Sequence, residues 1–122
     1  MAAIIGALSV ALGAFGAHSL KKYLPDDALA IFETAVRYQF YHVFALLTTG
    51  IMYAYIPTAK MRWAGYLFIT GILLFCCSLY FLCYIKFDRL TDWEWIGAIT
   101  PIGGAAFIGG WLLLFLAVGK RP

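Results

Sequence analysis

Six polar side chains whose types can transfer protons or bind ions lie close together where an apolar run begins. They are Glu33, Arg37, Tyr38, Gln39, Tyr41 and His42. On a helix, residues three or four apart lie on the same face. That spacing predicts one polar patch of two ridges, Glu33–Arg37–Tyr41 and Tyr38–His42. The patch is the first place to look for a functional site.

The chemistry open to this patch depends on what surrounds it. Glu33 precedes Arg37 by four residues, the favoured order for an ion pair along a helix. His42 could relay protons, ligate a metal or accept a hydrogen bond. The other histidine, His18, would come to the same end if the first two helices are antiparallel neighbours. Two histidines on different helices are weak support for a metal, so we expect no metal or cofactor and favour a structural hydrogen-bond network.

The sequence has no pattern typical of an enzyme. It contains no phosphate-binding loop, nucleophile–base–acid set or paired carboxylates of the hydrolase type. Three cysteines, Cys76, Cys77 and Cys83, share one apolar run without a metal-ligand spacing, so we interpret them as packing residues. We therefore expect a protein that is not an enzyme.

Composition predicts which elements position the patch. The chain has 122 residues, of which 64% are hydrophobic and 12% charged. A soluble domain of this size could not bury so much apolar surface, which indicates a lipid environment. The net charge of +3 is modest and its basic residues are dispersed, so no nucleic-acid partner is expected.

Four apolar segments predict an all-α integral membrane four-helix bundle in a single domain, 1–122. The spans are expected at about 2–17, 38–56, 63–84 and 95–118. The last two exceed the roughly 20 residues that cross a hydrocarbon core. The first is short, but no Lys or Arg precedes Lys21 as a signal peptide would require, so we expect a span that could begin before Met1.

The second span is expected to have an amphipathic lead-in. Pro25, Asp26 and Asp27 are typical of a helix start. A helix from 26 to 55 would be about 45 Å long, too long to be buried in one bilayer. Its first turns are therefore expected at the membrane interface.

Small residues in the first and last segments predict close helix contacts, with a kink where proline occurs. A broken helix around a substrate site is the less favoured alternative. The residues are Ser9, Gly13, Ala17, Pro101, Gly103, Gly104, Gly109 and Gly110.

The distribution of basic residues does not decide the orientation. Four spans place Lys60, Arg62, Lys120 and Arg121 on one side, against Lys21, Lys22, Arg37, Lys86 and Arg89 on the other. The positive-inside rule counts four against five, and cytoplasmic termini are only weakly favoured.

Three ordered motifs resemble a family of small bacterial inner-membrane proteins, domain of unknown function 423. They are Gly13-Ala14-Phe15-Gly16-Ala17-His18, Phe32-Glu33-Thr34 with Tyr38-Gln39 and Tyr41-His42, and Thr100-Pro101-Ile102-Gly103-Gly104 with Trp111. The resemblance covers essentially the whole chain. It implies four membrane helices in a bacterial cytoplasmic membrane or, alternatively, an organellar inner membrane, and it implies no activity. One departure is Cys76-Cys77 where the family tends to have Ser-Gly.

Two functions remain open. The first is a non-catalytic accessory or membrane-stabilising bundle, with the lipid bilayer and a larger membrane complex or further copies of itself as partners. The alternative is an oligomeric transporter or channel that uses Glu33, Arg37 and His42 as a polar path.

Overall fold

Every regular element in the described part of the chain is a helix. The computed structural model describes residues 1–89 and 91–119, without the side chains of 91, 92 and 94. The elements are α1 (Ala2–His18), η1 (Leu20–Lys22), α2 (Asp26–Tyr55), α3 (Ala59–Gly71), η2 (Ile72–Cys76), α4 (Cys77–Asp88), η3 (Thr91–Ala98) and α5 (Ile99–Val118). Lys120 and Arg121, which entered the orientation count, lie outside the described residues.

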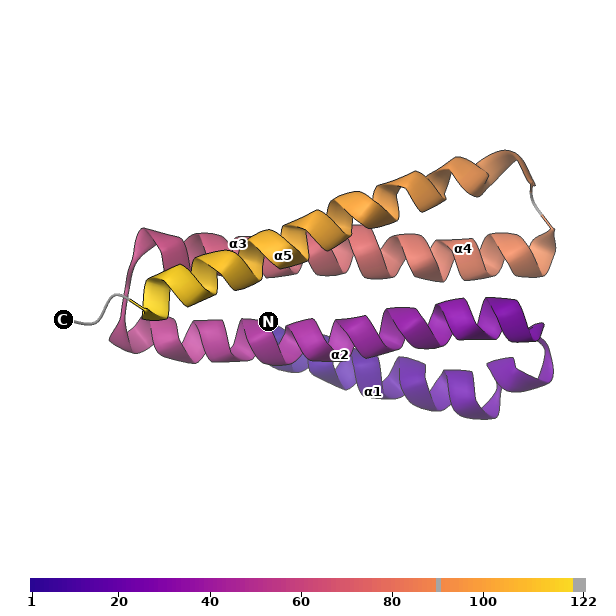
Figure 1. Ribbon diagram of the computed structural model, residues 1–122. Coiled ribbons are helices and arrows are strands. Elements are labelled where there is room, and N and C mark those ends of the chain that lie inside the picture. Colours follow the sequence, from indigo (N-terminus) through magenta and orange to yellow (C-terminus); the bar gives the residue numbers. More distant parts are fainter. Residues whose placement is uncertain (90, 120–122) are drawn as a thin grey trace.

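Four long helical runs lie roughly side by side (Figure 1). The elements α3, η2 and α4 form one run, Ala59–Asp88, in which η2 is π-helical. Helix α2 contacts α1, α3 and α4, and α5 packs on α3 and η2. The α1–α2 and α4–α5 connections lie at one end, and the α2–α3 turn lies at the other (Figure 1).

The helix boundaries follow from local chemistry. Helix α2 begins after Pro25 with two acids in its first turn, as the sequence predicts. The Thr58 hydroxyl caps α3 by accepting a hydrogen bond from the Met61 amide at 3.2 Å. Helix α4 ends at Asp88, because the next residue, Arg89, has a left-handed φ of 55° that stops the helix.

Aromatic side chains fill notches left by glycines between α3 and α5. A Cβ at Gly71 would lie 2.3 Å from the Phe107 ring, and one at Gly110 would lie 2.8 Å from the Phe68 ring. Each helix therefore supplies one ring and one notch. Near η2 the approach is closer, since a Cβ at Gly103 would lie 2.4 Å from the backbone nitrogen of Phe75.

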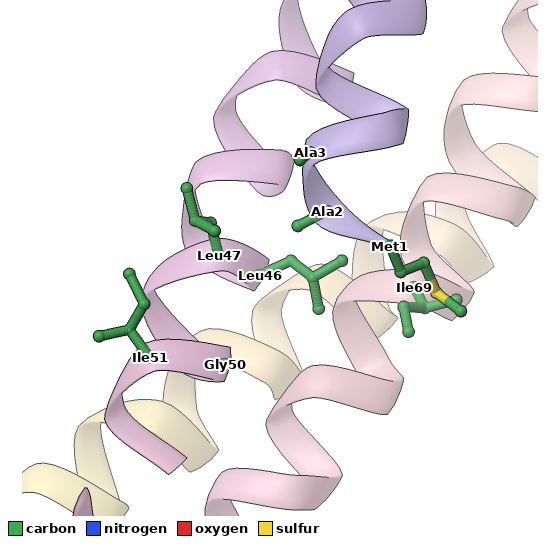
Figure 2. Close-up of a pocket in the computed structure, with 8 residues that line it drawn as sticks. All are labelled: Met1, Ala2, Ala3, Leu46, Leu47, Gly50, Ile51 and Ile69. Carbon is green, nitrogen blue, oxygen red and sulfur yellow. The ribbon is translucent and has the colours of Figure 1, made fainter. Parts of the chain in front are cut away.

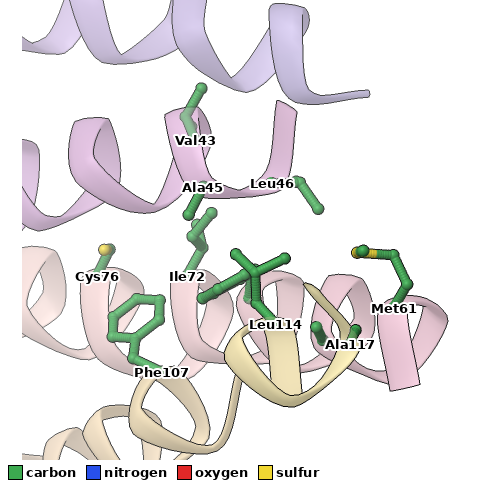
Figure 3. Packing of buried hydrophobic residues seen from close by; sticks show 11 residues of the cluster. Val43, Ala45, Leu46, Met61, Ile72, Cys76, Phe107, Leu114 and Ala117 are labelled. Carbon is green, nitrogen blue, oxygen red and sulfur yellow. The ribbon is translucent and has the colours of Figure 1, made fainter. Parts of the chain in front are cut away.

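The main hydrophobic core lies between α2, the α3–α4 run and α5 (Figure 3). A second, smaller cluster of Ala28, Phe32 and Cys83 lies nearer the end with the α1–α2 connection. Tyr80 packs against both clusters, and its hydroxyl bonds to Gln39, so polar groups lie where the two clusters meet.

Pro101 lies near the junction of two helical forms. A kink at Pro101 is expected from the sequence within a segment starting at 95; in the structure, residues up to Ala98 belong to η3 and α5 begins at Ile99. Pro101 is thus in the first turn of α5, where its missing N–H removes no intrahelical hydrogen bond.

Three helical runs are long and apolar enough to cross a membrane, by length and composition. They are Ala2–Lys22, Ala59–Asp88 and Trp95–Val118, among the described residues. The expected second span, 38–56, is not among them, because it starts with Tyr38, Gln39, Tyr41 and His42.

Candidate functional site

The six polar residues of α2 do not form one patch. Gln39 and His42 are buried, with 3% and 6% of their surface exposed, whereas Glu33, Arg37, Tyr38 and Tyr41 are exposed. The Tyr38 ring stacks on Phe75, with centroids 4.7 Å apart. Because α2 has protein on several sides, its polar face splits into an interior part and an outer part.

Both ring nitrogens of His42 are hydrogen-bonded, one within α2 and the other to α5. Nδ1 lies 2.7 Å from the Tyr38 carbonyl oxygen, which can only accept, so Nδ1 carries the proton. Nε2 then accepts the hydrogen bond from Trp111 Nε1 at 3.3 Å. The imidazole also stacks on Phe107, with ring centroids 3.4 Å apart and an interplanar angle of 11°. In this arrangement the neutral ring has no lone pair free for a metal.

Gln39 links α2 to α4 and α1. The Tyr80 hydroxyl donates to Gln39 Oε1 at 2.9 Å. Gln39 Nε2 donates to the Ile5 carbonyl of α1 over a long 3.5 Å, and the Ser9 hydroxyl donates to the same carbonyl at 2.8 Å. Ser9, expected as a packing residue, is fully buried at this contact.

A third polar link joins α4 to α5 beside the π-helical segment. The Ser78 hydroxyl donates to the Phe75 carbonyl at 2.9 Å, so it accepts from the Thr100 hydroxyl at 2.8 Å. Together with the Gln39 and His42 contacts, this bond makes what we call the interhelical network, which comprises Ile5, Ser9, Tyr38, Gln39, His42, Phe75, Ser78, Tyr80, Thr100 and Trp111. Within the described residues, no buried side-chain N or O atom lacks a hydrogen-bond partner.

Part of this network was not predicted from the sequence. Ser9, Tyr38, Gln39 and His42 were candidates, but Ser78 and Tyr80 were not, and Thr100 and Trp111 were noted only as motif residues. A signal was present, because Ser78, Tyr80 and Thr100 are hydroxyl groups inside predicted spans, where polar groups usually face a partner.

The predicted ion pair between Glu33 and Arg37 is not formed. In the described part of the chain one salt bridge occurs, from Lys86 Nζ to Asp27 Oδ2 at 2.6 Å. Glu33 and Arg37 instead line a groove of about 210 Å³ between α1 and α2, which we call the α1–α2 groove. Its other lining residues are Gly13, Gly16, Ala17, Phe32 and Val36.

His18 lies at the Glu33 end of the polar stretch, as antiparallel packing of α1 and α2 predicts, but it is distant from His42. Gly16 faces Phe32 and Gly6 faces Val43, so the antiparallel register places His42 beside the start of α1. His18 lies at the opposite end of α1, exposed, with Nδ1 3.1 Å from the Ala14 carbonyl oxygen. No cluster of three or more metal-ligating His, Cys, Asp or Glu residues occurs among those described.

Two grooves larger than the α1–α2 groove are lined almost entirely by apolar groups. One, of about 440 Å³, lies between the start of α1, α2 and α3 and contains no network residue (Figure 2). The other, of about 420 Å³, lies between α4 and the η3–α5 segment, and Ser78 is the network residue in its lining. Neither has the convergent polar groups of a small-molecule site.

Apolar helices of membrane-spanning length, joined by buried hydrogen bonds, define a small helical membrane protein of the polytopic class. The chain belongs to the family described as "Protein of unknown function (DUF423)", whose profile matches residues 12–104. This confirms the resemblance seen in the three motifs.

Similar proteins come from Gram-positive bacteria. A UPF0382 membrane protein of Staphylococcus epidermidis is 45% identical over 121 residues, covering 96% of this chain and 93% of its own length. The UPF0382 membrane protein YwdK of Bacillus subtilis is 38% identical, covering 98% and 94%. No solved structure matches this chain.

Proposed function

We propose that α1, α2, the α3–α4 run and α5 all cross the bacterial cytoplasmic membrane. Large apolar side chains are exposed on each run, including Leu8, Phe44, Leu73 and Phe115. Such surfaces suit lipid. Helix α2 can join the other three because Gln39 and His42, its most polar interior residues, bond to neighbouring helices.

The proposed function is that of a non-catalytic accessory or membrane-stabilising bundle. The main support for this function is that the polar atoms of the interhelical network form hydrogen bonds with one another, between helices. Groups engaged in this way hold membrane helices together. The outer surface, which is apolar over much of its area, is then available for lipid or for other membrane proteins.

Isolation from native membranes tests the accessory role. Tagged protein would be extracted in mild detergent and its co-purifying proteins identified by mass spectrometry, with an unrelated four-span protein carrying the same tag as control. We expect specific partners, or a measurable change in membrane stability when the gene is deleted. A protein that is monomeric, without partners and without effect on its membrane would contradict the proposal.

The transporter alternative has less geometric support. His42 bonds inside the bundle, whereas Glu33 and Arg37 line a different groove, so one chain does not join them into a path. Reconstituted vesicles distinguish the functions. For Glu33→Gln and His42→Ala, we expect ion and proton flux no different from wild type or from Tyr41→Phe, with less folded protein for His42→Ala. Flux abolished by both variants at normal folded yield would favour transport.

A further inference from the structure

The α1–α2 groove presents an acid and a base to the lipid side of the molecule. Glu33 and Arg37 both line it, and neither is in the one salt bridge or in any side-chain hydrogen bond found among the described residues. The floor consists of Gly13, Gly16 and Ala17, so the helices leave room beside the two charges. Charges facing lipid are costly, and they usually have a partner or a function.

For this inference we place the membrane boundary at His18, where α1 ends. In the antiparallel register, Gly16 and Gly13 face Phe32 and Val36, the residues just before Glu33 and Arg37. Counting from His18, these levels are about 3 and 8 Å deeper along the helix. The headgroup and interfacial layer is about 5–8 Å thick on each side, so both side chains can reach it.

The order of the two charges along α2 selects a headgroup. Glu33 is nearer the start of the helix, where α2 leaves the interface, and Arg37 is one turn deeper. In a zwitterionic phospholipid the phosphate is joined to the glycerol and the amine extends beyond it toward water. The deeper guanidinium therefore matches the phosphate, which it can bind with two hydrogen bonds, and the shallower carboxylate matches the amine.

We propose that the α1–α2 groove binds the phosphoethanolamine headgroup of a membrane phospholipid, with Arg37 on the phosphate and Glu33 on the ammonium group. A primary ammonium can donate hydrogen bonds to Glu33, which a quaternary choline cannot. A purely anionic headgroup would place no positive charge beside the carboxylate. This inference rests on the proposed membrane insertion and adds a lipid preference to it.

Lipid retention tests the proposal. The protein would be reconstituted with equal amounts of phosphatidylethanolamine and phosphatidylglycerol, re-extracted, and its retained lipids counted by native mass spectrometry. We expect wild type to retain phosphatidylethanolamine preferentially. Glu33→Gln should reduce that preference about tenfold, as expected from losing one charged hydrogen bond. Arg37→Gln removes the contact with the phosphate that both lipids carry, so it should reduce the retention of both. Asp26→Asn and Arg62→Gln, matched charge changes outside this groove, should keep the wild-type preference.

A charge swap separates headgroup binding from a simple ion pair. The double variant Glu33→Arg with Arg37→Glu keeps both charges but reverses their order, so we expect it to fold and to lose the preference. Free phosphoethanolamine and inorganic phosphate would be added as competitors. Displacement of the lipid by inorganic phosphate alone would show a phosphate site and overturn the headgroup assignment, as would equal retention of both lipids by wild type or retained preference in the swap.

The same samples distinguish failure of this inference from failure of the proposed insertion. Circular dichroism gives the helix content of every variant, and alkaline extraction of membranes reports insertion. Wild-type protein released by alkali would contradict the insertion itself. Inserted, fully helical protein without lipid preference would contradict the headgroup site alone.

Discussion

Gln39 and His42 differ from the exposed polar residues of α2 because protein surrounds them. A polar group without a hydrogen-bond partner in an apolar medium costs several kcal/mol, on the order of the whole gain from packing a large side chain. Here Tyr80 and Trp111 supply those partners. These two bonds are therefore expected to contribute to stability without taking part in chemistry.

We predict that Gln39 and Tyr80 do not contribute independently to the free energy of unfolding. Tyr80→Phe leaves Gln39 Oε1 without its donor, and Gln39→Leu leaves the Tyr80 hydroxyl without its acceptor. Each is expected to lower the free energy of unfolding by about 0.6–1.7 kcal/mol, the range for hydrogen bonds between membrane helices. A double-mutant cycle in mixed micelles should show that the double variant loses less than the sum. Strict additivity would mean that the bond contributes nothing.

The bond from Trp111 to His42 makes a second prediction. Trp111→Phe removes the donor and keeps an aromatic ring, and we expect it to lower the free energy of unfolding by about 1 kcal/mol. Trp63→Phe is the matched control, because Trp63 is 57% exposed and makes no hydrogen bond among the described contacts. Equal losses for the two variants would contradict a specific role for the His42 contact.

For the Gln39–Tyr80 and His42–Trp111 hydrogen bonds, the sequence indicated the residue on α2 but not its partner. A polar residue inside an apolar run stands out, so Gln39 and His42 were found from composition. Their partners lie 41 and 69 residues away along the chain, on helices whose rotation is set by packing. Helical spacing cannot supply that rotation.

At the scale of elements, glycines determine how closely α5 approaches the α3–α4 run. The rings of Phe68 and Phe107 can shift by rotation, but the Phe75 backbone beside Gly103 cannot move without displacing a helix. The contact lies in η2, where the helix widens to the π form and Ser78 bonds to the Phe75 carbonyl. Gly103 is therefore the least replaceable of these glycines.

Substitution by alanine measures this approach. Gly103→Ala adds a methyl group 2.4 Å from the Phe75 nitrogen, and overpacking of this kind costs about 1–3 kcal/mol. Gly50→Ala, in α2, meets nothing within 4 Å and should be neutral or slightly stabilising. Thermal unfolding in detergent compares the two. A Gly103→Ala variant as stable as Gly50→Ala would show that α5 is not held at this distance.

The ion pair between α2 and α4 predicts a pH dependence. The hydrogen bond from Lys86 holds the pKa of the exposed Asp27 carboxyl below its ordinary 3.8. Because the folded pKa is the lower one, the pair contributes stability above about pH 3.8, which is lost as pH falls through the folded value. Unfolding followed between neutral and acidic pH should show a small loss that Asp27→Asn removes and Asp26→Asn keeps. Identical pH profiles for all three proteins would contradict it.

Element positions were predictable where caps and composition mark them. Pro25 and the two acids after it predicted the start of α2, and three of the four apolar runs correspond to helical runs of membrane-spanning length. The π-helical η2 and the 3₁₀ segment η3 were not predicted. The amino-acid composition of a segment does not show whether its backbone hydrogen bonds follow the α, π or 3₁₀ pattern.

For the whole molecule, the open question is how α2 enters the membrane. Its window 38–56 is less apolar than the other three runs, yet its polar interior groups are bonded to neighbouring helices. We therefore expect α2 to insert together with its partners rather than by its own hydrophobicity. Composition predicted a helical membrane protein. It could not predict that insertion of α2 depends on its neighbours, because the polar groups of α2 find their hydrogen-bond partners only in the assembled bundle.

Cysteine labelling across the membrane tests that central claim most directly. In a background with Cys76, Cys77 and Cys83 replaced by alanine, Ser19→Cys and Pro57→Cys place single thiols before and after α2. An impermeant maleimide applied to sealed vesicles of known orientation reports the side of each. We predict labelling from opposite sides, because α2 crosses the membrane between them. Labelling of both thiols from the same side would contradict the four-span bundle.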